Sequence, residues 1–142
     1  MSLRHGQPLT LSSVGMAQAN HGIDAPGVIR NLLLIGAALE GVADRVALHD
    51  GDMRALPFEN ASFDLIVSSL ALHNIPTADG RAQAVREAVR VLKPGGQVAL
   101  LDFQKTGEYA HTLRESGMAA VRRSGMSFWM YPPVQVAFAR KP

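Results

Sequence analysis

Two carboxylates in this 142-residue chain follow segments that we expect to form β-strands. Asp24 closes a short stretch of strand character, and Asp52 follows the strand expected at residues 46–49. Ligands of open α/β sheets bind outside the carboxyl ends of the strands, where a carboxylate can accept hydrogen bonds from hydroxyl or amine groups. The alternatives are purely structural. Asp24 could cap a helix that starts near Pro26, and Asp52 could form a turn with Gly51.

A histidine follows the next expected strand. The unperturbed pKa of an imidazole lies near neutrality, so His73 could act as a general base on a substrate hydroxyl or amine. It could instead cap or pack at a loop between a strand and a helix. Asp102 ends a further expected strand, and it could face the same crevice or cap the segment after it. The other histidines show no metal-ligand spacing, and we expect no metal site; they are His5, His21, His49 and His111.

These residues are positioned by a predicted strand–helix–strand unit within residues 51–103. Residues 64–70 form an apolar run without alternation, which is typical of a strand buried on both faces of a parallel sheet. The sequence LKPGG at residues 92–96 ends the helix, and residues 97–103 form the second strand. Two strands joined through one helix make a right-handed parallel crossover. The helix has an apolar stripe at Val85, Ala88, Val89 and Leu92, with Arg81, Arg86, Glu87 and Arg90 on its other faces.

The first part of the chain is harder to interpret. Residues 1–21 show no sustained period, and we expect an irregular arm ahead of one α/β domain at residues 22–142. A helix is predicted from Pro26 to about Glu40. Its segment 31–39 is apolar on nearly every side, so it could be a buried helix, a strand or a partner-binding surface.

The last part of the chain predicts one helix and two strands. The helix covers residues 107–115 and ends at Gly117. The strands at residues 119–124 and 134–139 are joined by a hairpin-like connection. That connection holds the densest aromatic cluster, which could wall an apolar substrate pocket or cover the sheet edge or the helix layer; its members are Met126, Phe128, Trp129, Met130 and Tyr131.

The composition excludes several classes of protein. The chain has no cysteine, which excludes disulfides and thiolate metal sites and fits a cytoplasmic protein. Its net charge is only +2 and its basic residues form no block, which argues against nucleic acid as a partner. No apolar segment approaches the roughly 20 residues that span a bilayer, so we expect no membrane partner.

Several of these pieces, in this order and spacing, resemble the class I S-adenosylmethionine-dependent methyltransferases. They are Asp24, Gly51, Asp52, the LPF of residues 56–58, Phe63, Asp64 and the LKPGG of residues 92–96. The resemblance covers residues 22–142. It implies a Rossmann-like methyltransferase sheet, mostly parallel with an antiparallel C-terminal strand, in an α/β fold.

The resemblance also implies a cofactor, S-adenosylmethionine, and a role for each site residue. Asp24 would accept both ribose hydroxyls, and Asp52 would accept the exocyclic amine of adenine while the backbone N–H of Met53 reads a ring nitrogen. Ser69 and Leu70 would lie near the methionine part of the cofactor. His73 would then stand near the transferred methyl group, where a general base is useful.

One feature of that family is missing from the chain. The family begins its sheet with a strand and a glycine-rich turn, E/D-x-G-x-G-x-G, and upstream of Asp24 the only candidate glycines are Gly15 and Gly22. We therefore expect a fold that is truncated or rearranged at its N-terminus. A second copy of the chain could supply the missing core, which makes a homodimer a hypothesis.

Two functions are compatible with the sequence. One is methyl transfer to an unidentified, small-molecule acceptor. The other is a truncated, methyltransferase-like protein without catalytic activity, which acts through protein contacts or self-association.

Overall fold

The computed structural model describes residues 38–41, 43–45, 49 and 51–142. The chain divides into two units, Met1–Gly51 and Asp52–Pro142, and each is described by itself. In the first unit, the described residues include the 3-10 helix η1 (Ala43–Arg45). The predictions for Asp24 and for the arm with its boundary at residue 22 lie outside the described residues. So do residues 46–48 of the strand predicted at residues 46–49, and His49, its last residue, is not in a strand. Of the helix predicted at residues 26–40, only the last three are described.

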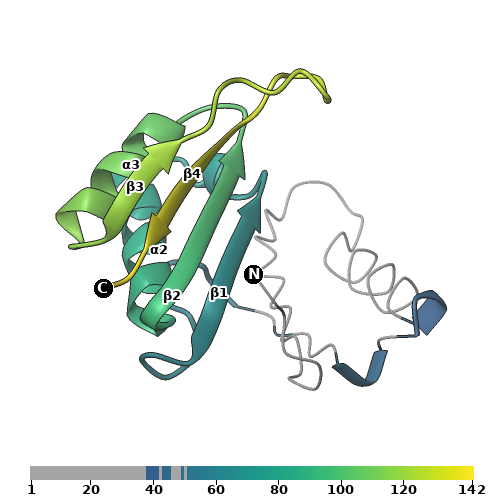
Figure 1. Cartoon of the computed structure of the whole chain (residues 1–142), viewed down its shortest axis with the longest axis vertical. Helices are drawn as coiled ribbons and strands as arrows, with labels where there is room; N and C mark the ends of the chain where they lie inside the picture. Colours follow the sequence, from purple (N-terminus) through teal and green to yellow (C-terminus); the bar gives the residue numbers. More distant parts are fainter. Residues whose placement is uncertain (1–37, 42, 46–48, 50) are drawn as a thin grey trace. The chain divides into compact units, whose positions relative to one another are not determined.

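The second unit is built on a four-stranded sheet with the order β1-β2-β4-β3 (Figure 1). β1 (Phe63–Ser69) pairs in parallel with β2 (Leu92–Asp102), and β4 (Gln135–Arg140) is antiparallel to both β2 and β3 (Ala119–Arg123). Three strands therefore run in one direction and the C-terminal strand runs against them. This confirms the predicted sheet, in which only the last strand is antiparallel.

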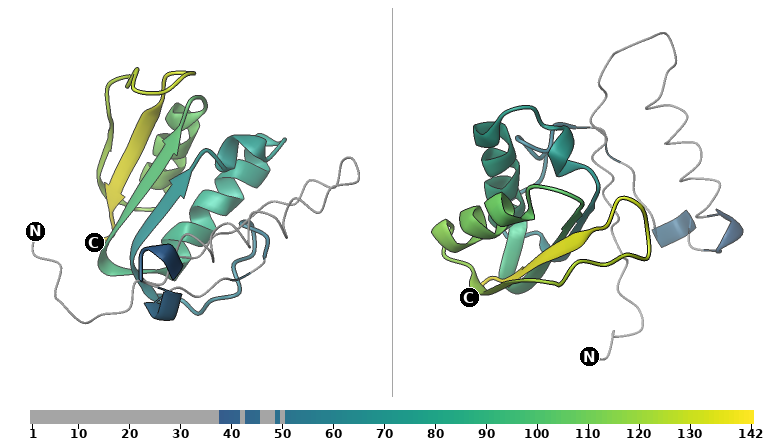
Figure 2. Two further views of the ribbon diagram at one scale, coloured as in Figure 1. Left: turned by 90° about the vertical axis from the view of Figure 1, so that its right-hand side faces the viewer. Right: turned by 90° about the horizontal axis from the view of Figure 1, so that it is seen from above.

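Both long helices lie on the same face of this sheet. α2 (Ala78–Val91) connects β1 to β2, and α3 (Thr106–Glu115) connects β2 to β3. Each crossover steps across the sheet in the same direction, so the right-handed rule places both helices on one side. Figure 2 shows the two helices side by side against the sheet.

α2 is capped at its first turn and packs as its sequence predicts, with one difference. The hydroxyl of Thr77 accepts a hydrogen bond from Gly80 N at 3.1 Å and caps the first turn. The predicted apolar stripe is buried through Val85, Ala88 and Val89. Arg81, which we expected on a polar face, is also buried, because its guanidinium donates to the carbonyls of Ile75 and Pro76 and pairs with Glu108.

α3 ends at a left-handed glycine. Gly117 has a φ of +75°, and its N–H donates to the carbonyl of Arg114. Met118 N donates to Leu113 O, and the Met118 side chain is buried, which together make a Schellman ending. The buried face of this helix carries Tyr109 and Leu113, which are among the most buried side chains.

The prediction that the strand at residues 64–70 is buried on both faces is wrong. Side chains that face the helices are covered, and Val98 and Leu100 on β2 are almost fully buried. Leu65 and Val67 on β1 point to the other face, and they are 53% and 62% exposed. The reason is that α2 and α3 both cover one face, and no helix of this unit covers the other.

Candidate active site

A buried carboxylate marks the carboxyl end of β2. Asp102 is fully buried, and three hydrogen-bond donors surround it. Its Oδ2 accepts from the Tyr109 hydroxyl at 3.0 Å and from His73 N at 3.1 Å, and its Oδ1 accepts from Phe103 N at 2.9 Å. These donors compensate for the water that the carboxylate loses on burial. Asp102 thus faces inward and ties η2 (Leu72–Asn74), β2 and α3 together.

His73 lies directly against this carboxylate. Its Nδ1 is 2.8 Å from Asp102 Oδ1, a close contact that becomes an ion pair when the imidazole is protonated, although the ring is not aligned for a hydrogen bond. The ring also packs on Phe103, with centroids 4.5 Å apart. The His73 side chain remains 16% exposed. His73 therefore packs in the loop between β1 and α2, which is one of the two roles that the sequence allowed. It also contacts a buried carboxylate.

Tyr109 completes the cluster from α3. Burial raises the pKa of its phenol well above the ordinary value, and the neighbouring charge of Asp102 raises it further. Tyr109 therefore stays protonated and acts as a hydrogen-bond donor to Asp102. On the adjacent strand, the hydroxyl of Ser68 is buried and has no hydrogen-bond partner among the residues that the structure describes.

Ser69 and Leu70 lie at the carboxyl end of β1, as predicted, and both are exposed. Leu70 has a φ of +53°, and its N–H donates to Leu101 O at 2.9 Å, which extends the β1–β2 pairing by one residue. The chain then turns back into η2. Because β1 and β2 are parallel, Ser69 and Asp102 end at the same edge of the sheet, and His73 lies near both strand ends.

Asp52 stands at the start of this unit and is already engaged. The Arg54 side chain donates to both carboxylate oxygens, with the shortest contact 2.6 Å from Nη2 to Oδ2, and Arg54 N donates to Oδ1 at 2.8 Å. These hydrogen bonds from Arg54 hold the pKa of Asp52 below its usual value. Ala55 N donates to Asp52 O, so a turn forms from Asp52 to Ala55, one step later than the turn with Gly51 that the sequence allowed. Met53, within this turn, is half-buried.

Two charged residues of α2 hold the loop that carries Asp52 and Met53, and sequence reasoning missed this role. Glu87 accepts a hydrogen bond from Leu56 N at 2.8 Å, and Arg90 donates to the carbonyls of Leu56 and Phe58. Arg90 also pairs with Glu87, and these hydrogen bonds hold the pKa of Glu87 below its ordinary value. The signal in the sequence was the opposite charges at i and i+3 on the face predicted to be polar.

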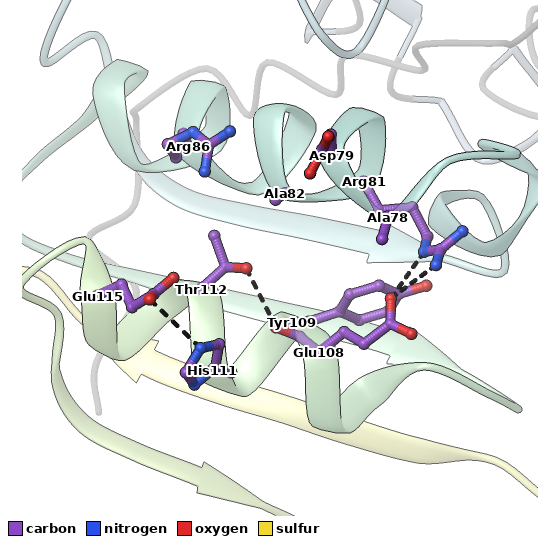
Figure 3. Close-up of a pocket in the computed structure, with 10 residues that line it drawn as sticks. All are labelled: Ala78, Asp79, Arg81, Ala82, Arg86, Glu108, Tyr109, His111, Thr112 and Glu115. Carbon is purple, nitrogen blue, oxygen red and sulfur yellow. Dashed lines mark hydrogen bonds and ion pairs between the residues drawn. The ribbon is translucent and has the colours of Figure 1, made fainter.

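The structure also has a groove that contains none of the predicted site residues. It has a volume of about 270 Å³ and lies between α2 and α3, where Figure 3 shows Arg81 reaching across to Glu108. Tyr109 lines it, but the phenol hydroxyl is committed to Asp102. The groove is therefore a feature of the helix layer, and the candidate active site lies at the carboxyl ends of the strands. Among the described residues, no group of three or more potential metal ligands is present.

Comparisons with known proteins identify the family of this chain. The model of a methyltransferase domain family matches residues 22–100, which is more than half of the chain. A ubiquinone/menaquinone biosynthesis C-methyltransferase of Brucella anthropi is 41% identical over 69 residues, covering 49% of this chain and 25% of that protein. A demethylmenaquinone methyltransferase of Lactiplantibacillus plantarum is 37% identical over 81 residues, covering 57% and 33%. The matched part thus spans about a quarter to a third of these relatives.

Solved structures agree on the fold. One of a putative sarcosine dimethylglycine methyltransferase from Galdieria sulphuraria has a TM-score of 0.67 and 16% identity, covering 93% of this chain and 69% of that one. A structure described as the [4+2]-cyclase SpnF has a TM-score of 0.63 and 16% identity, covering 94% and 66%. Proteins with similar folds therefore catalyse different reactions, so the family of this chain is assigned from the sequence match and not from the fold. This chain belongs to the class I S-adenosylmethionine-dependent methyltransferases, as its sequence predicted.

Proposed function

We propose that this chain takes part in methyl transfer from S-adenosylmethionine to a small-molecule acceptor. The observation that carries the proposal is the contact between His73 and the buried Asp102 beside the strand end at Ser69. In a member of this family, that edge of the sheet is where a cofactor and an acceptor would meet. The names of relatives that act in quinone biosynthesis support a small organic acceptor.

The described part of the predicted cofactor site suits the chemistry of the cofactor. Ser69 and Leu70 are exposed at the strand end, so a hydroxyl and a backbone segment are accessible to the methionine part. Met53 offers apolar surface for a base, and the Asp52 carboxylate is an acceptor for its amine. Adenine binding would have to share this carboxylate with Arg54, whose side chain is half-exposed and can turn into solvent.

His73 would serve as the general base. With Nδ1 against Asp102, the nitrogen left for a substrate proton is Nε2, and the nearby carboxylate stabilises the imidazolium that forms. The bound cofactor would supply an electrophilic methyl group on a sulfonium sulfur. Positioning of the acceptor against that carbon would account for most of the rate enhancement.

Calorimetric titration with S-adenosylmethionine and S-adenosylhomocysteine tests this proposal. We expect binding, and we expect Asp24→Ala and Asp52→Ala each to weaken it by about 1–3 kcal/mol, because each removes a charged hydrogen-bond acceptor. His73→Gln is the matched control, since His73 would contact the acceptor and not the cofactor. No heat of binding at millimolar ligand would overturn the proposal, and unchanged affinity in both aspartate variants would overturn the assigned site.

A second candidate is a protein that self-associates without catalysis. The open sheet face at Leu65 and Val67 favours it, because a homodimer could bury that apolar surface. Sedimentation should then show a dimer that Leu65→Gln combined with Val67→Gln converts to a monomer. A stable monomer of the unmodified chain at low micromolar concentration would rule this candidate out.

A further inference from the structure

The connection between β3 and β4 carries the most exposed aromatic side chains of the described chain. Trp129 is 98% exposed, Tyr131 is 96% exposed and Phe128 is 76% exposed. We call residues 126–131 the aromatic loop. The expectation that this cluster covers the sheet edge or the helix layer is wrong, because its rings are exposed and not packed against either. Figure 1 shows the loop projecting beyond the ends of the strands.

The base of the loop is ordered. Ser127 and Val134 exchange two backbone hydrogen bonds, at 2.7 and 3.0 Å, and Val134 is buried. Ser124 Oγ accepts a hydrogen bond from Val136 N, which ties the end of β3 to β4. The aromatic side chains are therefore presented at the tip of a hairpin whose base is hydrogen-bonded to the sheet.

The charged residues of the two strands that flank the loop are all basic. β3 ends with Arg122 and Arg123, both exposed. The guanidinium of Arg122 lies over the Phe138 ring, 5.4 Å from its centroid, and neither arginine forms an ion pair with another described residue. From residue 116 to the C-terminus the sequence contains four basic residues and no Asp or Glu. At the same edge, the carboxylate of Glu108 is engaged by Arg81 and Lys105. Exposed tryptophan and tyrosine beside uncompensated arginine are the combination that suits a lipid–water interface carrying negative charge.

We propose that the aromatic loop and the two arginines at its base dock this protein on a bilayer surface containing anionic lipid headgroups. The aromatic rings would enter the headgroup region, and Arg122 and Arg123 would remain at the level of the phosphates. This inference does not depend on methyl transfer. The proposal departs from the expectation that the chain has no membrane partner, which rested only on the lack of a segment long enough to span a bilayer. In the described part of the chain no helix has the length and hydropathy to cross a membrane.

The direction of the strands places the aromatic loop at the same edge of the sheet as the candidate active site. β3 runs parallel to β1 and β2, so the aromatic loop leaves the sheet at the edge where Ser69 and Asp102 end. A bilayer bound by the loop would therefore lie toward this edge, and molecules dissolved in its surface would be close to His73.

Trp129 is the only tryptophan of the chain, so tryptophan fluorescence measures this docking directly. The test mixes the full chain with vesicles of phosphatidylcholine alone, or of equal parts phosphatidylcholine and phosphatidylglycerol. With the anionic vesicles we expect the emission of Trp129 to shift to shorter wavelength and brominated lipid to quench it. Raising the salt to about 1 M should reverse much of the binding, since screening then acts within about 3 Å.

Two pairs of variants separate the contributions. Arg122→Gln with Arg123→Gln should lower the partition coefficient for anionic vesicles about 25-fold, from roughly a five-fold loss for each arginine. The matched control is Arg86→Gln with Arg114→Gln on the two helices, which removes the same charge and should change binding little. Trp129→Ser with Tyr131→Ser should lower partition, measured by vesicle flotation, by about ten-fold or more. Circular dichroism confirms that each variant is folded.

Three outcomes would overturn the proposal. One is no change in Trp129 emission with the anionic vesicles. Another is equal loss of binding in the control pair, which would indicate a general effect of net charge. The third is a shift that appears without vesicles and grows with protein concentration, which would identify a second copy of the chain as the occupant of the loop.

Discussion

The two faces of the sheet differ in what covers them. On the face below α2 and α3, Val98 and Leu100 are nearly inaccessible, and the carboxylate of Asp102 is surrounded by donors. On the other face, Leu65 and Val67 leave more than half of their surface exposed. On β1 the open face carries Leu65 and Val67 while the helix-facing side carries Ile66 and Ser68, so the difference in cover comes from the crossovers and not from the apolar content of the strand. The covered face supplies the stability of this unit, and the open face is available for other contacts.

The largest expected effect comes from matched truncations on the two faces. Leu100→Ala should lower the free energy of unfolding by about 2–5 kcal/mol, because it removes a side chain from a closed core and leaves a cavity. Val67→Ala should lower it by about 0.5 kcal/mol or less, as is usual for exposed positions. Denaturant unfolding measures both. A large loss in Val67→Ala would show that the open face is covered in solution.

A second prediction concerns the polar group on the covered face. Asp102→Ala should destabilise the protein by about 2–4 kcal/mol, because it leaves the Tyr109 hydroxyl and two backbone N–H groups without an acceptor. Combining it with Tyr109→Phe should recover part of the loss, since one of the stranded donors is then gone. Strictly additive losses in the double variant would contradict the hydrogen bond between these two residues.

A third, smaller prediction uses the pH dependence of stability. The folded pKa of Glu87 lies below its ordinary value of 4.5 because of the hydrogen bonds from Arg90. The stability that Glu87 contributes is therefore complete at pH values above 4.5. It is lost as the pH falls below that value and passes through the lowered pKa of the folded state. Unfolding followed between neutral pH and acid should show a steeper loss of stability for the native chain than for Glu87→Gln. Parallel curves for the two proteins would contradict the interaction.

The predictions from sequence succeeded where the pattern is local. The apolar period of α2, the turn after α3 at Gly117 and the strand propensities on either side of the aromatic loop all depend on residues close together in the chain. The order of short motifs sufficed for the family and for its cofactor. The roles given to Asp24, Asp52, Met53, Ser69 and Leu70 stay predictions that the titrations above can test.

Other features required the folded chain. His73 and Asp102 are 29 residues apart, and no periodicity could show that they touch. The exposure of Leu65 and of Trp129, and the burial of Arg81, depend on which elements pack against them, and side-chain type predicted the opposite in each case. Sequence by itself determined the main elements of the second unit and the family, because propensity and motif spacing act over short distances. Only the tertiary structure decided which face of the sheet is covered and which acid meets the histidine, because those contacts arise from crossovers that bring distant segments together.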